Sequence, residues 1–334
     1  MSTVLENKKR QRKLPGKLLG GRRLTKYVLG QYAWSIIRGV IIIGICFLIL
    51  YPTLVKILVS FMNEKDLYDV SIRYIPKNPT LENYKTVIKA MKFGEGFWNT
   101  FKLSLSTSIM QLIACTIIGY GFARFKFKGR GFLFALVIVT LIVPPQTIMI
   151  PLFLHFLNFD IFGIFELISG KPLNLLNSMA PFILMSMTGM GLKNGLYIYI
   201  LRQFFRGMPK ELEEAAYVDG AGLFKTFYRI MLPSAIPAMV TVFLFSFVWQ
   251  WTDSFYSSLF LQSTRVLATS LSGVSYQVSQ HFYNMTGVTT VLSPALSSMY
   301  TNTASLLVVL PLLIVYLFAQ RYFVESIERT GIVG

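Results

Sequence analysis

The chain has few of the residues on which disulfide and metal chemistry depend. Its 334 residues include 2 cysteines and 2 histidines. Cys46 and Cys115 both fall inside long apolar runs, so neither a disulfide framework nor a metal motif is available. His155 and His281 are far apart in sequence and lack ligand-like spacing. The sequence therefore predicts no metal site.

Recognisable catalytic and nucleotide-binding motifs are also missing. We find no Ser-His-Asp constellation, no Walker A sequence and no glycine-rich loop of the kind that holds phosphates. We therefore predict that the chain is not an enzyme, has no cofactor and does not bind ATP itself.

Charge is scarce as well, which excludes an ordinary soluble domain. Charged residues make up 14% of the chain and hydrophobic residues 54%, whereas soluble domains carry about 25% charged residues. The apolar residues gather in runs of about 20 or more, long enough to cross a bilayer as helices. We expect an all-α polytopic membrane protein with six transmembrane helices, near residues 37–61, 98–122, 132–157, 177–201, 234–260 and 298–323. The fourth is the weakest, because Lys193-Asn194-Gly195 interrupts it.

The charge that is present is mostly positive and unevenly placed. Of the 32 Lys and Arg residues, ten lie between Lys8 and Arg38. The positive-inside rule then places both termini in the cytoplasm. Residues 1–33 are predicted to be a basic cytoplasmic tail that touches anionic lipid rather than nucleic acid, and residues 34–334 a transmembrane domain. The basic stretch is too long for a cleaved signal peptide, so the first apolar run is interpreted as a signal anchor.

Three smaller features carry expectations. Thr80 is placed to cap a short helix at 81–92 in the first external loop. Pro144 and Pro145 interrupt the third apolar run, which leaves open a kinked packing helix or a functional hinge. The external loop at 261–297 is polar, with Arg265 as its single charged residue, and loops of this length are usually functional or disordered.

The segment 208–233, MPKELEEAAYVDGAGLFKTFYRIMLP, is a polar interruption on the cytoplasmic side. Its glutamates follow Pro209, where a helix start favours acids. At 100° per residue, Leu212, Ala215 and Ala216 share one stripe, while Glu213 and Glu214 face away from it. Asp219-Gly220 is expected to end the helix, with Gly220 in the left-handed conformation.

A second short helix is predicted to follow in the same segment. Leu223, Phe224, Phe227, Tyr228 and Met231 line one side of it, and its basic residues share the other. This pattern is typical of a helix lying in the membrane interface. The composition alone is also compatible with an ordinary amphipathic connector.

The spacing of segment 208–233 resembles the EAA signature of inner-membrane permease subunits of binding-protein-dependent ABC importers. The matching positions are Glu214-Ala215-Ala216, Gly220, Ile230 and Leu232-Pro233. Flanking stretches at 128–130, 144–146, 201–205 and 331–334 are similar to the carbohydrate branch, the maltose-type MalG permeases. The resemblance covers roughly residues 35–334 and implies a MalG-like fold in the bacterial inner (plasma) membrane. The tail is longer than is usual in the family.

The resemblance also implies roles and partners. The helix containing Leu212, Glu213, Glu214, Ala215 and Ala216 would be a coupling helix that docks on a dimer of cytoplasmic ABC ATPases, which bind the ATP. Asp219 and Gly220 would form the bend after that helix. A second permease subunit would complete the pathway, and an extracellular or periplasmic binding protein would deliver a sugar.

Candidate residues for the solute pathway come from the residues themselves. The fifth run contains Trp249, Gln250, Trp251 and Asp253, and aromatic faces beside amide and carboxylate groups suit sugar rings. An interfacial aromatic belt produces similar residues. Lys193 would lie within the fourth run, where a charge costs about 2.5–3.5 kcal/mol and normally faces water or a partner.

Other functions remain open at this point. An importer permease for a non-sugar solute would carry the same signature. A membrane assembly or sensor protein could use the same segment to bind a cytoplasmic partner. A secondary transporter ranks lower, because Asp253 is the one acid near the interior of an apolar run and no repeat is evident.

Overall fold

The computed structural model describes residues 21–289 and 291–331, and within these ranges all regular structure is helical apart from one isolated bridge between Phe159 and Leu173. The chain divides into two units, Met1–Leu58 and Val59–Gly334. Helix α2 (Gly21–Ser60), of which all but the last two residues belong to the first unit, runs without interruption through the expected tail boundary at residue 33. Residues 1–20 of the expected tail lie outside the described part.

Three described helices are long and apolar enough to cross a membrane. They cover Gln31–Ser60 within α2, Phe93–Arg124 as α5, and Pro294–Gln320 within α18 (Pro294–Gly331). These helices confirm the first, second and sixth predicted apolar runs as helical. Two further bent pairs of helices raise the number of candidate crossings to five if each pair is one span. Six continuous helices are therefore not observed.

The third predicted run is broken at its prolines. Helix α6 (Arg130–Ile142) ends before Pro144, a 3-10 turn covers Pro145–Ile148, and α7 (Met149–Leu157) continues at 99° to α6. Proline lacks the amide hydrogen and pushes the preceding residue out of the helical region. Val143 and Pro144 accordingly have extended backbones, with ψ angles of 118° and 133°. The predicted interruption at Pro144 and Pro145 is thus confirmed, and the bend is too sharp for one continuous helix over 132–157.

A second bend lies at the start of the fifth predicted run, between the short helix predicted within segment 208–233 and the apolar run at 234–260. Helix α12 (Leu223–Thr226), a π-helical turn (Phe227–Met231) and α13 (Leu232–Ser234) form one arm, and α14 (Ile236–Thr252) forms the other at 71°. Prolines at 233 and 237 flank the bend. Helix α14 stops at Thr252, and the separate helix α15 (Phe255–Phe260) covers the rest of the predicted run.

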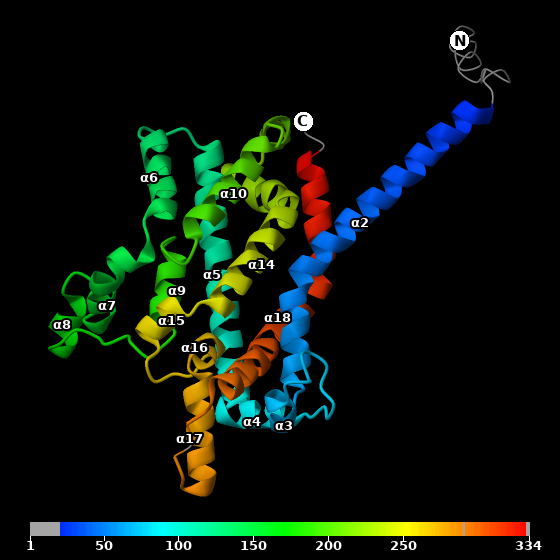
Figure 1. Ribbon diagram of the computed structural model, residues 1–334. Helices are drawn as coiled ribbons and strands as arrows, with labels where there is room; N and C mark the ends of the chain where they lie inside the picture. The colour runs from blue at the N-terminus through cyan, green and yellow to red at the C-terminus, as the bar shows by residue number, and fades with distance from the viewer. Residues whose placement is uncertain (1–20, 290, 332–334) are drawn as a thin grey trace. The chain divides into compact units, whose positions relative to one another are not determined.

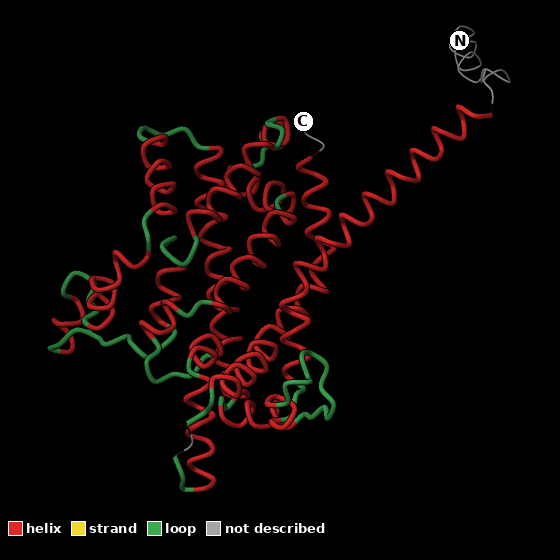
Figure 2. The backbone as a smooth tube through the Cα atoms, in the orientation of Figure 1, coloured by secondary structure: helices red, strands yellow, loops and turns green. Residues whose placement is uncertain are grey.

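The fourth predicted run contains two helices instead of one. Helix α9 (Ala180–Met187) and helix α10 (Asn194–Gly207) are separated by residues 188–193. In this break Gly189 and Lys193 have positive φ angles of 75° and 61°. The Gln111 side chain donates to the Leu192 carbonyl at 2.9 Å, which gives the interrupted backbone a hydrogen-bond partner. The predicted interruption at Lys193-Asn194-Gly195 is therefore confirmed. The prediction of one continuous helix over 177–201 is wrong (Figure 2).

Helix α5 packs against α10, α14 and α9 in the second unit (Figure 1). Helices α5 and α10 approach closely at Gly119, where a Cβ atom would lie 2.9 Å from Leu201 Cβ. Ser246 of α14 donates to Ser108 of α5 at 3.1 Å and also bonds Gln111. Such small residues and interhelical hydrogen bonds replace the hydrophobic effect as the cohesive forces between membrane helices.

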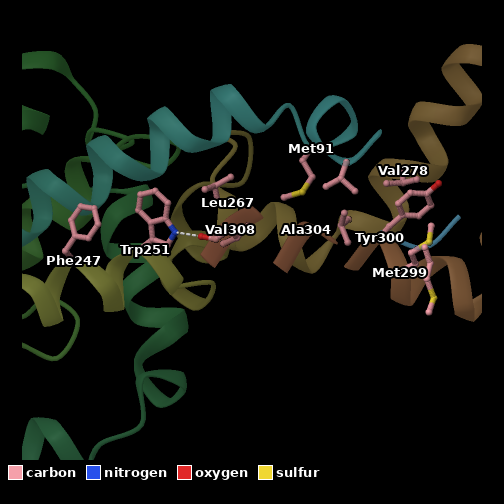
Figure 3. Close-up of a cluster of buried hydrophobic side chains, with 12 residues drawn as sticks. Met91, Phe247, Trp251, Leu267, Val278, Met299, Tyr300, Ala304 and Val308 are labelled. Atoms are coloured by element: carbon pink, nitrogen blue, oxygen red, sulfur yellow. Dashed lines mark hydrogen bonds between the residues drawn. The ribbon is translucent and has the colours of Figure 1, made fainter. Parts of the chain in front are cut away.

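The loops at 62–97 and 261–297 contain helices. Helices α3 (Glu64–Tyr68) and α4 (Glu82–Ala90) lie in the first loop. The predicted helix at 81–92 is thus present but shorter, with Leu81 at the N-cap position, and the Glu82 amide donates to Thr80 Oγ1 at 3.1 Å. The loop at 261–297 contains α16 (Leu267–Ser272) and α17 (Val274–Thr286). Val274 and Val278 of α17 are buried in a cluster with Met91 of the first loop (Figure 3). The loop is thus ordered over its described residues.

Candidate functional site

Helix α11 (Glu211–Val218) is the centre of segment 208–233, with three glutamates in its first turn. Its end is a Schellman motif, in which the Ala221 amide donates to the Ala216 carbonyl at 2.9 Å and the Gly220 amide to the Tyr217 carbonyl at 3.0 Å. Gly220 has φ +77°. The predicted left-handed Gly220 is confirmed, and this residue sets the direction of the chain leaving α11.

The predicted contact face of α11 is only partly exposed. Leu212 is 40% exposed and Ala215 is also exposed, but Ala216 is 4% exposed. Glu213, expected on the opposite, solvated side, is 9% exposed. The structure therefore corrects the predicted stripe, because Glu213 and Ala216 together form the side that packs against the rest of the chain. Glu214 remains exposed, as expected.

Val218 also lies on the exposed side of α11, although the predicted stripe did not include it. It is 88% exposed, three residues beyond Ala215 and six beyond Leu212. We call Leu212, Ala215 and Val218 the docking face, and exposed acids border it at Glu211, Glu214 and Asp219. The i, i+3, i+6 spacing was a signal that could have identified Val218. A narrow apolar stripe with an acidic border suits a groove on another protein.

Glu213 is held by two residues of α5. Its Oε2 lies 3.5 Å from Arg124 Nη1, and its Oε1 accepts from Tyr120 Oη at 3.0 Å. Arg124 Nη2 also donates to the Met208 carbonyl at 2.8 Å. These contacts join residues up to 93 positions apart, so nothing in local spacing indicates them.

The arm after α11 presents aromatic side chains outward. Leu223, Phe224 and Tyr228 are 60%, 82% and 64% exposed. Phe227 and Met231 instead turn inward, and the Phe227 ring lies 4.6 Å from that of Tyr120. The predicted apolar side is thus divided between the protein interior and the surface, which agrees with a helix that lies at a membrane interface.

Burial raises the pKa of the Tyr217 hydroxyl above its usual value, and the nearby Glu213 charge adds to the increase. Among residues 21–289 and 291–331, no cluster of three or more His, Cys, Asp or Glu residues is placed to hold a metal.

Two of the predicted pathway residues have structural roles. Trp251 is 1% exposed, its indole donates to the Val308 carbonyl at 3.1 Å, and it packs against Phe247 (Figure 3). Asp253 accepts from the amides of Tyr256 at 3.3 Å and Ser257 at 2.9 Å, so it caps the start of α15. The prediction that these side chains face a pathway is not supported by this geometry.

The other predicted pathway residues differ from these two. Lys193 Nζ lies 4.9 Å from the centre of the Trp249 ring, and Trp249 is 46% exposed. This cation–π contact joins Lys193, in the break before α10, to the exposed side of α14. Gln250 is buried, and its Nε2 atom has no hydrogen-bond partner in the described part of the chain.

The fold and site define a membrane-embedded helical subunit in which a loop carries a short helix with one exposed side. The sequence matches the family described as binding-protein-dependent transport system inner membrane component over residues 115–329, well over half of the chain. The chain belongs to this family of ABC importer permease subunits.

Two relatives and one solved structure illustrate the similarity. The arabinooligosaccharides transport system permease protein AraQ of Halalkalibacterium halodurans is 26% identical over 299 residues, 87% of this chain and 93% of AraQ. The osmoprotective compounds uptake permease protein GgtD of Synechocystis sp. is 30% identical over 250 residues, 74% of this chain and 73% of GgtD.

The solved structure is a crystal structure of a bacterial ABC transporter involved in the import of the acidic polysaccharide alginate. One of its chains aligns with a TM-score of 0.68 and 19% identity, covering 88% of this chain and 98% of that chain. At this identity the match establishes the fold.

Proposed function

We propose that the chain is one of two permease subunits of an importer for oligosaccharides, driven by a cytoplasmic ABC ATPase dimer. The observation that carries this proposal is the docking face of α11, an apolar stripe exposed to solvent in a chain that belongs to an importer family. The names of relatives such as AraQ favour oligosaccharides as the solute. An extracellular or periplasmic binding protein would deliver the sugar.

The proposed topology has six crossings and both termini in the cytoplasm. The bent pair of α6 and α7 would cross once, and α14 would cross once beyond the 71° bend. Helices α9 and α10 would provide the sixth crossing in two pieces. Irregular backbone is tolerated at membrane depth where it is buried in protein or lines a cavity. The arm 223–234 would then lie along the cytoplasmic membrane surface, with its exposed aromatic side chains in lipid.

Deletion of the gene, followed by measurement of labelled oligosaccharide uptake, tests this function. We expect uptake of at least one oligosaccharide to be lost and to return with the wild-type gene. The complex purified from the complemented strain should import the same sugar into proteoliposomes only when ATP is supplied. Unchanged uptake of every oligosaccharide in the deletion strain would contradict the sugar assignment.

Substitution in the docking face tests the ATPase interaction. Ala215→Phe adds bulk at an exposed position, so the permease should fold normally but bind the ATPase about fivefold more weakly, a loss of roughly 1 kcal/mol. Gln203→Phe, which adds the same side chain at an exposed position on α10, is the control. Equal ATPase affinity for both variants, measured by titration in detergent, would show that α11 is not the contact.

The Lys193–Trp249 pair is the proposed pathway contact. An indole face stacks on sugar rings, and an ammonium group donates to hydroxyl or carboxylate oxygens. Lys193→Met and Trp249→Ala are each expected to raise the KM for uptake about threefold, a loss of about 0.6 kcal/mol in binding. Trp98→Ala, which removes another exposed tryptophan, is the control and should leave the KM unchanged. An unchanged KM in both test variants would remove the pair from the pathway.

A further inference from the structure

Helix α11 is connected to α10 and to α14 through the backbone, but to α5 through side chains. Glu213 of α11 contacts Arg124 Nη1 at 3.5 Å and Tyr120 Oη at 3.0 Å, both at the end of α5. Arg124 also donates to the carbonyl of Met208 at 2.8 Å, just before α11. Tyr120 and Arg124 lie one helical turn apart, so both reach Glu213 from the same side of α5.

This contact is buried, unlike the other ion pairs of the described chain. The Arg124 and Glu213 side chains are 8% and 12% exposed, whereas those of Lys85 and Glu82 are 65% and 69% exposed. Exposed pairs contribute little, but removing one partner of a buried pair leaves an uncompensated charge. Glu213 and Arg124 therefore hold each other in place in a way that the surface pairs do not.

The aromatic ring of Tyr120 extends the contact to the neighbouring elements. Its ring centre lies 4.6 Å from that of Phe227 in the π-helical turn, 5.3 Å from Phe205 of α10 and 5.5 Å from Phe125. The same end of α5 thus contacts the elements before and after α11. A displacement of α11 cannot leave α5 in place without breaking the hydrogen bond and ion pair at Glu213.

We propose that Tyr120, Arg124 and Glu213 form a clamp that makes α5 move together with α11. The inference rests on the proposed function and adds a second route from the ATPase to the membrane helices, beside the covalent route through the 71° bend into α14. Because α5 packs against α9, α10 and α14, its displacement would reach each of them. The three residues are positioning residues and do not touch solute.

The clamp is tested in the reconstituted importer by the number of solute molecules imported per ATP hydrolysed. Glu213→Gln, Arg124→Gln and Tyr120→Phe are each expected to lower this ratio about threefold while the ATPase stays bound. The exchanged pair Arg124→Glu with Glu213→Arg restores the opposite charges and should recover part of the ratio. Glu82→Gln breaks the exposed ion pair with Lys85 and serves as the control, with no change expected.

The possible outcomes separate the clamp from the proposed function. A wild-type complex without ATP-dependent import overturns the proposed function and the clamp's role with it. A wild-type complex that imports, together with variants that keep the full ratio, overturns the clamp alone. If single variants do not fold, the exchanged pair decides: a folded exchanged pair with a recovered ratio supports the clamp, and a folded one with no recovery overturns it.

Discussion

A Gly119→Val variant is expected to lose most of its folded protein in the membrane. A Cβ atom at Gly119 would lie 2.9 Å from Leu201 Cβ, 3.1 Å from the Arg202 amide nitrogen and 3.4 Å from the Ile198 carbonyl oxygen. Two of these atoms are backbone atoms of α10 and cannot rotate away. Overpacking of cores costs about 1–3 kcal/mol, and we expect the upper end because α10 itself would have to move.

Gly121→Val is the matched control for this prediction. Gly121 lies on the same helix, and a Cβ atom there would meet no atom within 4 Å. Both variants add the same side chain, so helix propensity and hydrophobicity cancel in the comparison. The yield of monodisperse protein and the melting temperature in detergent measure the effect. Equal values for the two variants would show that α5 and α10 do not approach as closely as described.

A Gly220→Val variant is expected to fold but to lose ATP-driven uptake by more than about tenfold, equivalent to roughly 1.4 kcal/mol. No atom lies within 4 Å of a Cβ at Gly220, so the side chain has space. The penalty comes from φ +77°, a conformation that β-branched residues strongly avoid. The Schellman motif would therefore rearrange, and the docking face would change direction relative to α14.

Gly222→Val separates backbone strain from added bulk. Gly222 also has open space, but its φ is −73°, an ordinary value that valine accepts. Uptake should be retained in this variant. Gly220→Asn is expected to be intermediate, because asparagine tolerates the left-handed conformation. Membrane insertion of each variant is measured in parallel. Normal uptake by Gly220→Val would contradict the proposed coupling role of α11.

The ends of helix α11 could be predicted from local sequence patterns, but its buried side could not. The start, the end and the left-handed glycine of the helix follow from glutamates, Asp219 and Gly220, because capping is a local interaction. The side of α11 that packs inward could not be derived in this way. Glu213 is buried because Arg124, 89 residues earlier, supplies the opposite charge. A helical wheel contains no information about such a partner.

For the pathway candidates, too, the sequence indicated which residues are present but not which way each side chain faces. The aromatic and polar composition of α14 was evident, but alternate residues of a helix face different surroundings. Trp249 turns outward to Lys193, while Trp251 packs into the core beside Val308. Asp253 caps α15, a separate helix that could not be recognised within the continuous apolar run at 234–260.

The sequence by itself determined the class of the protein, the helical nature of its apolar runs and the position and ends of helix α11. These depend on composition, on run length and on local capping, all of which act between residues close in sequence. Tertiary structure decided how the breaks are stabilised, because an interrupted backbone at membrane depth survives only if groups such as the Gln111 amide, 81 residues from Leu192, satisfy it. It also decided which side of α11 is free, since that depends on how α5 packs against α10 and α11.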